Sequence, residues 1–280
     1  MASYKTALNV QKCFIYVIMV ILALLALIPI YILLINATRT DLEITAGISL
    51  IPGTNLAHNW NALTGQGFRI SHGFFNSAFI ALTTTVLNVY FSAMTAYGLH
   101  VYKFKGRNIL WALILIVIML PPSLSFIGLY QLVANVGLLD NFIPLIVPAI
   151  AGAASVLFIR QYMNSVTSTA LIEAARIDGA NEFYVFNKIM MPILTPALAA
   201  QGIFTFVASW NNFLIPFVLI SSRERYTLPM LVQMLSGDIF RTEFGGIYLG
   251  IAISIVPIII FYCFMSRLII SGLTLGGVKE

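Results

Sequence analysis

Charged side chains are scarce in this sequence. Only 9% of its 280 residues are Asp, Glu, Lys or Arg, whereas 60% are hydrophobic, and the mean hydropathy is +0.95. An average soluble domain has roughly 25% charged residues. Too few polar side chains are present to cover the surface of a water-soluble fold. The composition therefore excludes that class and predicts an integral membrane protein.

Residues that could build a reactive centre are also few and scattered. The two cysteines, Cys13 and Cys263, lie in apolar stretches, which excludes a disulfide framework and a CxxC metal site. His58, His72 and His100 show no metal-ligand spacing, so we expect no metal site. The chain lacks both a nucleophile–base constellation and a G-x-x-x-x-G-K-[ST] loop for nucleotide phosphates. We therefore expect no catalytic residue, no enzyme activity and no cofactor bound by this chain.

Six apolar runs are long enough to cross a bilayer. One charge at the membrane centre costs about 2.5–3.5 kcal/mol, so uncharged runs of roughly 20 residues mark candidate helices. These runs predict an all-α fold with spans at 14–35, 74–98, 109–130, 142–159, 193–220 and 245–266. Trp111 and Tyr130 would mark the two ends of the third span, about 28 Å apart along one helix. The run 44–68 is rejected because PGTNLAHNWN holds turn formers and amides.

The distribution of Lys and Arg predicts the orientation. With both termini on one side, ten basic residues lie on that side and five on the other, which indicates that both termini are cytoplasmic. The net charge of +5 is explained by this bias, so no nucleic-acid partner is expected. We expect a bacterial cytoplasmic (inner) membrane protein with several spans, in contact with membrane lipid.

The spans predict three parts of the chain. Residues 1–72 would comprise an N-terminal tail, a peripheral first helix and a polar extracytoplasmic segment. Residues 73–266 would form a five-span core, and 267–280 a cytoplasmic tail. Pro121-Pro122 should break the third span, either beside a translocation path or as a packing kink. The many small residues in the spans favour close helix packing.

The spans have no Asp, Glu, Lys or Arg near their centres. Carriers driven by ions or protons usually need such groups as relays. This argues against an ion-coupled secondary carrier or channel for a small polar solute. That alternative stays open because backbone carbonyls and hydroxyls can also bind sodium.

The loop 165–192 is the exception to the apolar composition, and it lies on the predicted cytoplasmic side. Ser168 or Thr169 could cap a helix that ends at Gly179, where a positive φ is expected. Asn181 could cap a second short helix that ends before Pro192. Small residues and charges on such a helix–glycine–helix suit the docking of a partner. An amphipathic helix pair that only completes the loop is equally compatible with these residues.

The segment EAARIDGANEFYVFNKIMMP resembles the EAA loop of binding-protein-dependent ABC importer permeases. The pattern E-A-A, three residues, G, nine residues and I-x-L-P is matched by the residues Glu173, Ala174, Ala175, Gly179, Ile189 and Pro192. Met191 replaces the leucine, and Thr167-Ser168 occupies the region of a frequent proline. VASWNNFLIPFVLI, YTLPMLV and SGLTLGGVKE extend the resemblance over about 73–280, to the MalG-like carbohydrate branch. The terminal Glu280 departs from the usual glycine.

The resemblance implies a type I ABC importer permease fold and a set of partners. A second, MalF-like permease would complete the path, and two ATP-binding subunits would hold ATP and Mg²⁺. An extracytoplasmic solute-binding protein would deliver a carbohydrate. Because only differential contact with two ATPase states can transmit motion, the EAA loop would have to contact those states differently.

The resemblance also assigns roles to individual residues. The ATPase-coupling residues would be Glu173, Ala174, Ala175, Asp178 and Gly179. Glu173 would fix the register, the alanines would permit close contact and Gly179 would form the turn. In the fifth span, Trp210, Asn211 and Asn212 could line a substrate path, since aromatic faces and amides suit sugars. Hydrogen bonding between helices explains these three residues equally well.

Overall fold

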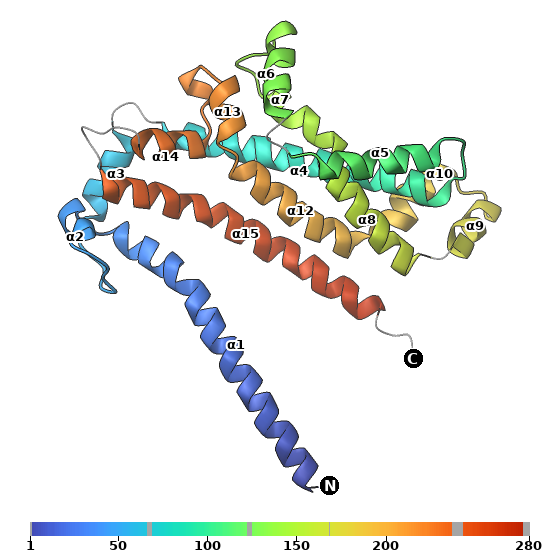
Figure 1. Ribbon diagram of the computed structural model, residues 1–280, viewed down its shortest axis with the longest axis horizontal. Coiled ribbons are helices and arrows are strands. Elements are labelled where there is room, and N and C mark those ends of the chain that lie inside the picture. The colour runs from blue at the N-terminus through green and yellow to red at the C-terminus, as the bar shows by residue number, and fades with distance from the viewer. Residues whose placement is uncertain (1, 66–68, 122–124, 168, 237–242, 277–280) are drawn as a thin grey trace. The chain divides into compact units, whose positions relative to one another are not determined.

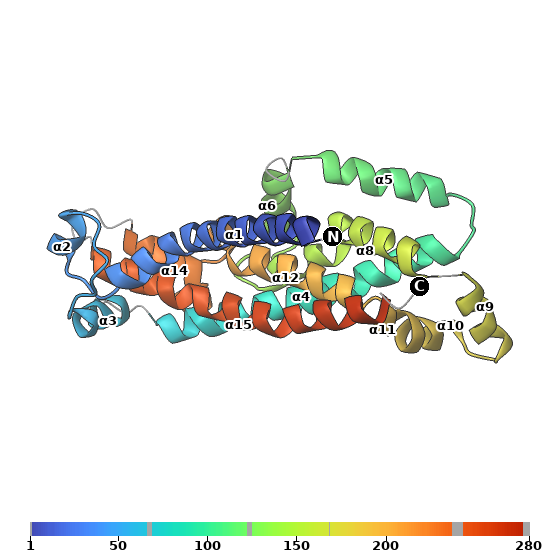
Figure 2. The same cartoon turned by 90° about the horizontal axis from the view of Figure 1, so that it is seen from below.

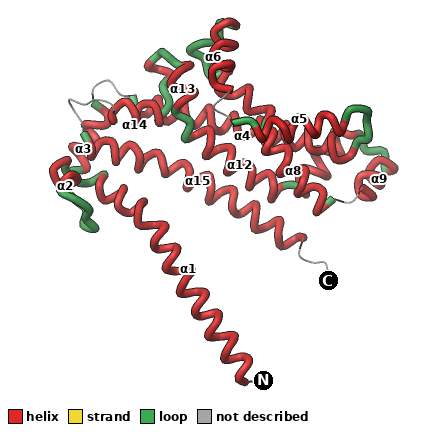
Figure 3. Tube along the Cα trace, viewed as in Figure 1, coloured by secondary structure: helices red, strands yellow, loops and turns green. Residues whose placement is uncertain are grey.

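The computed structural model describes residues 2–65, 69–121, 125–167, 169–236 and 243–276, and each regular element in these ranges is a helix (Figures 1 and 3). The elements are α1 (Ala2–Asn36), α2 (Asp41–Thr45), α3 (Leu56–Thr64), α4 (Ile70–Val101), α5 (Arg107–Met119), α6 (Ser125–Asn135), α7 (Ile143–Ile146), η2 (Val147–Ala151), α8 (Ala153–Val166), α9 (Thr169–Ile177), α10 (Glu182–Tyr184), η3 (Val185–Met190), α11 (Met191–Ile193), α12 (Thr195–Trp210), α13 (Leu214–Leu219), η4 (Arg223–Arg225), α14 (Leu228–Ser236) and α15 (Phe244–Gly276). The predicted all-α class is confirmed.

The chain divides into two compact units. The first comprises Met1–Phe68 with Val232–Ile255, and the second comprises Arg69–Leu231 with Val256–Glu280. The long helix α15 contributes its first part to one unit and its remainder to the other. The boundaries at 72 and 266 that we expect from the sequence stay predictions.

In the first unit, the polar stretch after α1 is folded around buried polar side chains. The Arg39 guanidinium is buried and donates to Asn36 Oδ1 at 3.0 Å and to the Gly47 carbonyl at 2.9 Å. The Asn59 amide, also buried, donates to the Ala37 carbonyl at 2.9 Å. These bonds stabilise a compact polar segment with only short helices. Among the described residues of 44–68 the helices α2 and α3 are too short to cross a bilayer, which agrees with the rejection of this run as a span.

In the second unit, α4 is the central helix. Both α8 and α12 pack along it, and α5 packs on α8 (Figures 1 and 2). Small α4 residues, Ala81, Ser92, Ala93 and Ala96, are fully buried where these helices meet. Small side chains allow helix backbones to approach closely where lipid supplies no hydrophobic driving force. The packing role that we expect for the small residues agrees with this arrangement.

The number of membrane spans is only partly settled by the helices. Among the described residues, four stretches are long and apolar enough to cross a membrane: Lys12–Asn36, Ile70–Val101, Ile143–Val166 and Phe244–Ile269. The bent pair Glu182–Ile193 and Thr195–Trp210 would add a fifth. The helices α5 and α6 are each shorter than a span. The prediction of six spans therefore stays a prediction.

The third predicted span is interrupted, as Pro121-Pro122 predicts, but the expectation that Trp111 and Tyr130 mark the two ends of one helix is wrong. Helix α5 ends at Met119, and Leu120 is extended at ψ 132°. The residue before a proline is driven out of the α region, and Pro121 follows Leu120. Trp111 and Tyr130 therefore lie on different helices, and the Trp111 ring lies 3.9 Å below the Arg160 guanidinium. Pro122 is outside the described residues.

The start of the fourth predicted span is irregular, and α4 satisfies its backbone. Around Pro148 the chain forms the 3₁₀ turn η2 before α8 begins. Asn88 of α4 donates to the Ala149 carbonyl at 2.5 Å and accepts from Ser155 Oγ at 2.8 Å. A Cβ on Gly152 would lie 2.1 Å from the Asn88 amide nitrogen, so only glycine fits there. In lipid such breaks persist only where neighbouring groups satisfy the freed backbone.

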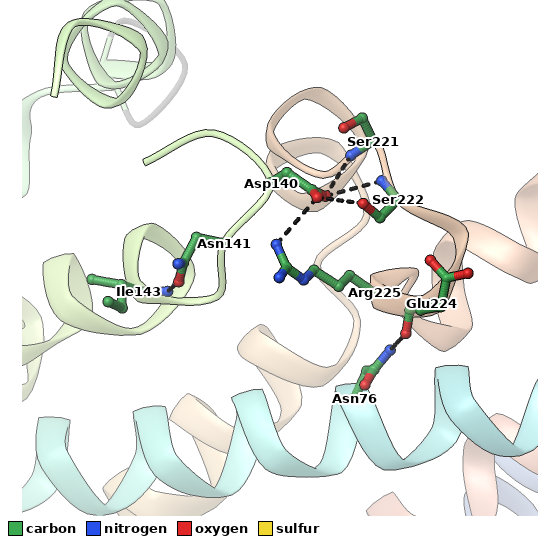
Figure 4. A network of polar contacts seen from close by, with 8 residues as sticks. All are labelled: Asn76, Asp140, Asn141, Ile143, Ser221, Ser222, Glu224 and Arg225. Carbon is green, nitrogen blue, oxygen red and sulfur yellow. Dashed lines mark hydrogen bonds and ion pairs between the residues drawn. The ribbon is translucent and has the colours of Figure 1, made fainter. Parts of the chain in front are cut away.

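The loop before α7 is tied to the loop after α13 by one carboxylate (Figure 4). Asp140 accepts from the backbone N–H groups of Ser221 and Ser222 at 3.0 and 2.9 Å, and from the Ser222 hydroxyl. The carboxylate also forms an ion pair with Arg225, whose Nη1 lies 3.1 Å from Asp140 Oδ2. The Ser222 hydrogen bonds, more than the Arg225 charge, hold the pKa of Asp140 below its ordinary value.

The same loop is fastened to the beginning of α4. The Asn76 amide donates to the carbonyls of Glu224 and Tyr226, at 2.8 and 3.0 Å (Figure 4 shows the first). Further along, Ser77 accepts from the Leu228 N–H at 2.9 Å. Segment 221–228 is therefore held by α4 on one side and by Asp140 on the other.

Asn88→Leu should destabilise the helix core. The change keeps the side-chain volume but leaves the Ala149 carbonyl and the Ser155 hydroxyl short of a partner in an apolar surrounding. Because several interhelical bonds are lost, we expect the free energy of unfolding to fall by about 1–2 kcal/mol. Unfolding in detergent measures this, with Val86→Leu, at a 66% exposed position of α4, as the control. Equal effects of the two changes would contradict the role given to Asn88.

Candidate functional site

The loop 165–192 has the helix–glycine–helix form predicted for it. Helix α9 ends at Ile177, and Gly179 follows with φ +84°. The Gly179 N–H donates to the Arg176 carbonyl, and the Ala180 N–H donates to the Ala175 carbonyl, both at 3.0 Å. This pair of bonds is the Schellman motif, which requires a left-handed residue after the helix. The positive φ that the sequence predicts for Gly179 is therefore confirmed.

The second helix begins where the sequence places it. The Asn181 side chain accepts from the Tyr184 N–H at 2.8 Å, so Asn181 is the N-cap of α10. The helix then widens into the π-helical turn η3 and continues through α11. At the start of the loop, Thr169 is the first residue of α9, and Ser168 lies outside the described residues.

One face of the loop forms part of the hydrophobic core. Its buried members are Ile172, Ala175, Val185, Phe186 and Met190, which pack with the last turns of α4 and with α8. Phe186 lies between two α4 tyrosines, with its ring centroid 5.7 Å from that of Tyr90 and 5.4 Å from that of Tyr97. The loop is therefore fixed to the bundle and presents its opposite face outward.

The structure separates the predicted coupling residues into two sets. Glu173, Ala174, Asp178 and Gly179 are exposed and lie on α9 or its C-terminal turn. Ala175 is only 8% exposed and belongs to the core beneath them. Four of the five residues therefore share a surface that another molecule could reach, whereas Ala175 fills space inside the chain.

Large apolar side chains extend this exposed surface, and the sequence interpretation did not include them. Ile177 is 86% exposed and Phe183 is 71% exposed, on either side of the turn at Gly179. Exposed apolar groups beside charges are typical of a protein–protein contact. The signal was present in the sequence, since both residues fall on the polar side of a short amphipathic helix. We call the loop 165–192 the elbow, and we define Glu173, Ala174, Ile177, Asp178 and Phe183 as the elbow surface.

A second feature that the motif did not reveal is a carboxylate that joins the elbow to α4. Glu182 Oε1 accepts from Arg176 Nε at 2.6 Å, across the turn. Its Oε2 accepts from the hydroxyls of Tyr97 at 3.0 Å and Tyr102 at 2.5 Å. The Arg176 guanidinium also lies 5.8 Å from the centre of the Tyr102 ring. One side chain therefore contacts α9, α10 and the end of α4.

These bonds keep Glu182 charged. The hydrogen bond from Arg176, followed by that from Tyr102, lowers the pKa of Glu182 to about 2. The pKa of Arg176 is raised by the same bond. Burial, with the neighbouring carboxylate, raises the pKa of Tyr102. At neutral pH the cluster is therefore an ion pair with two phenol donors.

The predicted substrate-path residues occupy the end of α12. Trp210 is 1% exposed, and its ring contacts those of Phe74 and Phe206, with centroids 5.6 and 5.7 Å away. Asn211 is exposed at the C-cap of α12, where the helix stops. Asn212 accepts from the Ile215 N–H at 3.4 Å, at the start of α13. The three residues are adjacent, but only the asparagines are accessible.

Comparison with known sequences identifies the family. Residues 88–274 match the family described as binding-protein-dependent transport system inner membrane component. The match covers the C-terminal part of α4, the whole elbow and nearly all of α15.

Whole-length relatives agree with this match. The chain is 35% identical, over all of both chains, to the arabinooligosaccharides transport system permease protein AraQ of Bacillus subtilis (strain 168). It is 29% identical to the lactose transport system permease protein LacG of Rhizobium radiobacter, over 94% of this chain and 95% of that protein.

A solved structure shows the same fold. One chain of a bacterial ABC transporter, involved in the import of the acidic polysaccharide alginate, superposes with a TM-score of 0.76 at 22% identity. The superposition covers 92% of this chain and 96% of that one, so this chain has the ABC importer permease fold. The chain belongs to the family of binding-protein-dependent transport system inner membrane components, as a permease subunit of a multi-pass membrane transporter and not as an enzyme.

Proposed function

We propose that this chain forms part of the membrane path of an ATP-driven importer for a carbohydrate. An extracytoplasmic binding protein delivers the solute, and separate ATPase subunits drive the path between its inward-open and outward-open forms. The elbow surface is the observation that carries this proposal. It combines exposed charges, small residues and large apolar side chains on a turn that is anchored to the bundle.

The solute class is inferred from the relatives. Their names refer to arabinooligosaccharides, lactose and, for a protein of Yersinia enterocolitica that is 29% identical, sn-glycerol-3-phosphate. All three are rich in hydroxyl groups. A hydroxylated solute of the carbohydrate class is therefore the cargo that we assign to this chain.

The partners follow from the family. The proposed complex contains a second, MalF-like permease and two ATP-binding subunits, which hold ATP and Mg²⁺. Glu173 fixes the register in a groove of one ATPase, while Ala174 and Gly179 allow close approach. Asp178 adds a rim charge. Ala175 supports these residues from the core and does not itself reach the groove.

The proposed topology has six spans, with both termini in the cytoplasm. The third span is formed jointly by α5 and α6, and the fifth by α12 and α13. This arrangement puts the elbow on the cytoplasmic side and segment 221–228 on the opposite side. It also agrees with the excess of Lys and Arg beside the termini.

We assign the substrate path, as part of the same proposal, to the break after α12. Trp210, Asn211 and Asn212 lie there, where the backbone leaves the helix. Irregular backbone at membrane depth is tolerated where it lines a cavity or is buried in protein. Because the Trp210 ring is covered by Phe74 and Phe206, the asparagine amides are the groups available to sugar hydroxyls.

The function is tested by import into vesicles that contain the full complex, with its ATPase and binding protein. We expect ATP-dependent uptake of the sugar that the binding protein carries. Glu173→Gln should lower the uptake rate about tenfold, which corresponds to about 1.4 kcal/mol of lost interaction with the ATPase. Co-purification of the subunits should persist, because the substitution removes one charge and leaves the rest of the elbow surface unchanged.

Lys103→Gln serves as the matched control, because it removes one exposed charge outside the elbow. Uptake by the isolated chain under an ion gradient, without ATP, would instead support a secondary carrier. Wild-type rates in Glu173→Gln would show that the elbow surface has been misassigned.

The proposed orientation is tested with single cysteines. Cys13 and Cys263 are exposed on apolar helices, so both are first replaced by serine. Lys103→Cys, which lies outside the surface that the ATPase would cover, should react with a membrane-impermeant maleimide only after the membrane is opened, whereas Arg223→Cys should react in intact cells. Both positions are exposed in the structure. The reverse pattern of labelling would invert the topology.

Gly179 is tested by a pair of substitutions. A Cβ at this position meets no atom within 4 Å, so space is not the constraint. Ala should cost about 1–2 kcal/mol in the left-handed conformation, whereas Asn tolerates it. That cost would reduce the native turn by a factor of roughly 5–30. Gly179→Ala should therefore speed amide hydrogen exchange at 174–184 and lower the uptake rate. Gly179→Asn should change neither quantity. Equal behaviour of the two variants would contradict the proposal that transport needs the left-handed turn at Gly179.

A further inference from the structure

We propose that α4 is the rod that carries motion from the elbow to the opposite side of the membrane, and that Glu182 is the residue that attaches the elbow to it. This inference rests on the proposed function. It adds the internal route by which a movement at the ATPase would reach the far end of the permease. Glu182 acts here as a positioning residue, because it touches neither ATP nor the transported solute.

The first step is the attachment of the elbow to α4. The Glu182 side chain, on α10, contacts Arg176 of α9 and two tyrosine hydroxyls at the end of α4. Tyr97 lies in the last two turns of α4, and Tyr102 is the C-cap residue of that helix. A displacement of α9 by a partner therefore acts on Glu182 through Arg176, and on α4 through the two hydroxyls.

The second step is a further polar contact on the same face of α4. Tyr90, seven residues before Tyr97 and thus two turns away, donates from its hydroxyl to Asn187 Oδ1 at 3.2 Å. Asn187 also donates to the Phe183 carbonyl at 2.9 Å, which fixes the π-helical turn. The segment 182–187 is therefore aligned along α4 by directional bonds at both of its ends.

The third step follows α4 across the membrane. The helix is continuous over 32 residues, and its middle is bonded to the η2–α8 region through Asn88. Near its start, Asn76 holds the carbonyls of Glu224 and Tyr226. The route thus runs through contiguous contacts from the elbow to segment 221–228, which Asp140 grips from the other side.

These attachments are suited to transmission more than to stability. The Arg176 and Glu182 side chains are 37% and 44% exposed, and ion pairs that face water contribute little to folding. The elbow is already held by buried Ile172, Phe186 and Met190. Removing the charge should therefore leave the complex assembled while it loosens the link between elbow and α4.

The test uses the complete complex with Glu182→Gln. We expect the subunits to co-purify and ATP hydrolysis to continue, while sugar imported per ATP falls about tenfold, within the usual range of coupling between sites. Tyr97→Phe and Tyr102→Phe should each give a smaller loss. Because all three share one link, Tyr97→Phe should add nothing further in the Glu182→Gln background. Lys188→Gln and Tyr184→Phe, at exposed positions of the same segment, are the matched controls.

A second readout follows the far end of the rod. In a cysteine-free background, a probe on Arg223→Cys should report an ATP-dependent change in the wild-type complex and lose that change with Glu182→Gln. A merely structural role of Glu182 would not move this signal while assembly is intact. Should Glu182→Gln fail to assemble, the Tyr97→Phe/Tyr102→Phe double variant, which keeps the ion pair with Arg176, decides in its place.

The outcomes separate the two proposals. If the wild-type complex does not import with ATP, the proposed function fails. If it imports and Glu182→Gln imports as much per ATP, or the Arg223 probe still responds to ATP in that variant, the rod proposal is overturned while the function stands. Multiplicative losses in the double variant of Glu182 and Tyr97 would likewise overturn the shared link.

Discussion

The fold depends on one constraint: backbone groups within a membrane must find partners inside the protein. The second unit meets this constraint through α4, which is unbroken and can therefore offer side chains to helices that are not. Asn88 satisfies the Ala149 carbonyl beside the 3₁₀ turn at Pro148, and Asn76 satisfies two carbonyls of the loop after α13. The irregular segments are thus positioned by the regular one. Where the chain leaves the helical conformation, asparagine side chains of α4 donate hydrogen bonds to the backbone carbonyls that would otherwise lack a partner in an apolar surrounding.

The elbow differs from the membrane-spanning segments because water can hydrogen-bond to its exposed backbone groups. Its backbone needs no polar support from the bundle, and the core of its inner face is hydrophobic, with Ile172, Phe186 and Met190. In the described part of the chain, the polar contacts with α4 are made by side chains of the elbow and not by its backbone. Its outer face keeps charges beside bare apolar side chains such as Ile177 and Phe183. The composition of this face becomes reasonable when part of it is covered by another protein.

The sequence was sufficient for local structure where chemistry is local. Gly179 predicted a turn with a positive φ and Asn181 predicted a helix N-cap, and both residues have the expected geometry. Charge counting identified the candidate apolar helices, and the turn formers and amides of PGTNLAHNWN led to the rejection of 44–68 as a span. Pro121-Pro122 predicted a break in the third span, but the spacing of Trp111 and Tyr130 did not show that the break puts them on different helices. Nor could the sequence place Ala175 inside and Ala174 outside, since that depends on which face of α9 meets α4 and α8. The Glu182 cluster joins residues 80 and 85 positions apart, and no short motif encodes such a contact.

A polar side chain within a membrane costs free energy unless it is hydrogen-bonded. The positions of such side chains along α4 therefore indicate where this helix is tied to its neighbours. Apolar helix surfaces in lipid can slide past one another with little change in energy, since lipid tails replace side-chain contacts almost equally well. A hydrogen bond cannot slide, because its energy falls steeply with distance and angle. Bonds at Asn76, at Asn88 and at Tyr97 fix the register of α4 against its neighbours near its start, in its middle and near its end. A helix held in this way must move together with the segments bonded to it or break those bonds. This separates the roles of the two kinds of contact: apolar packing keeps the bundle together, and the few polar contacts decide which of its parts move as one.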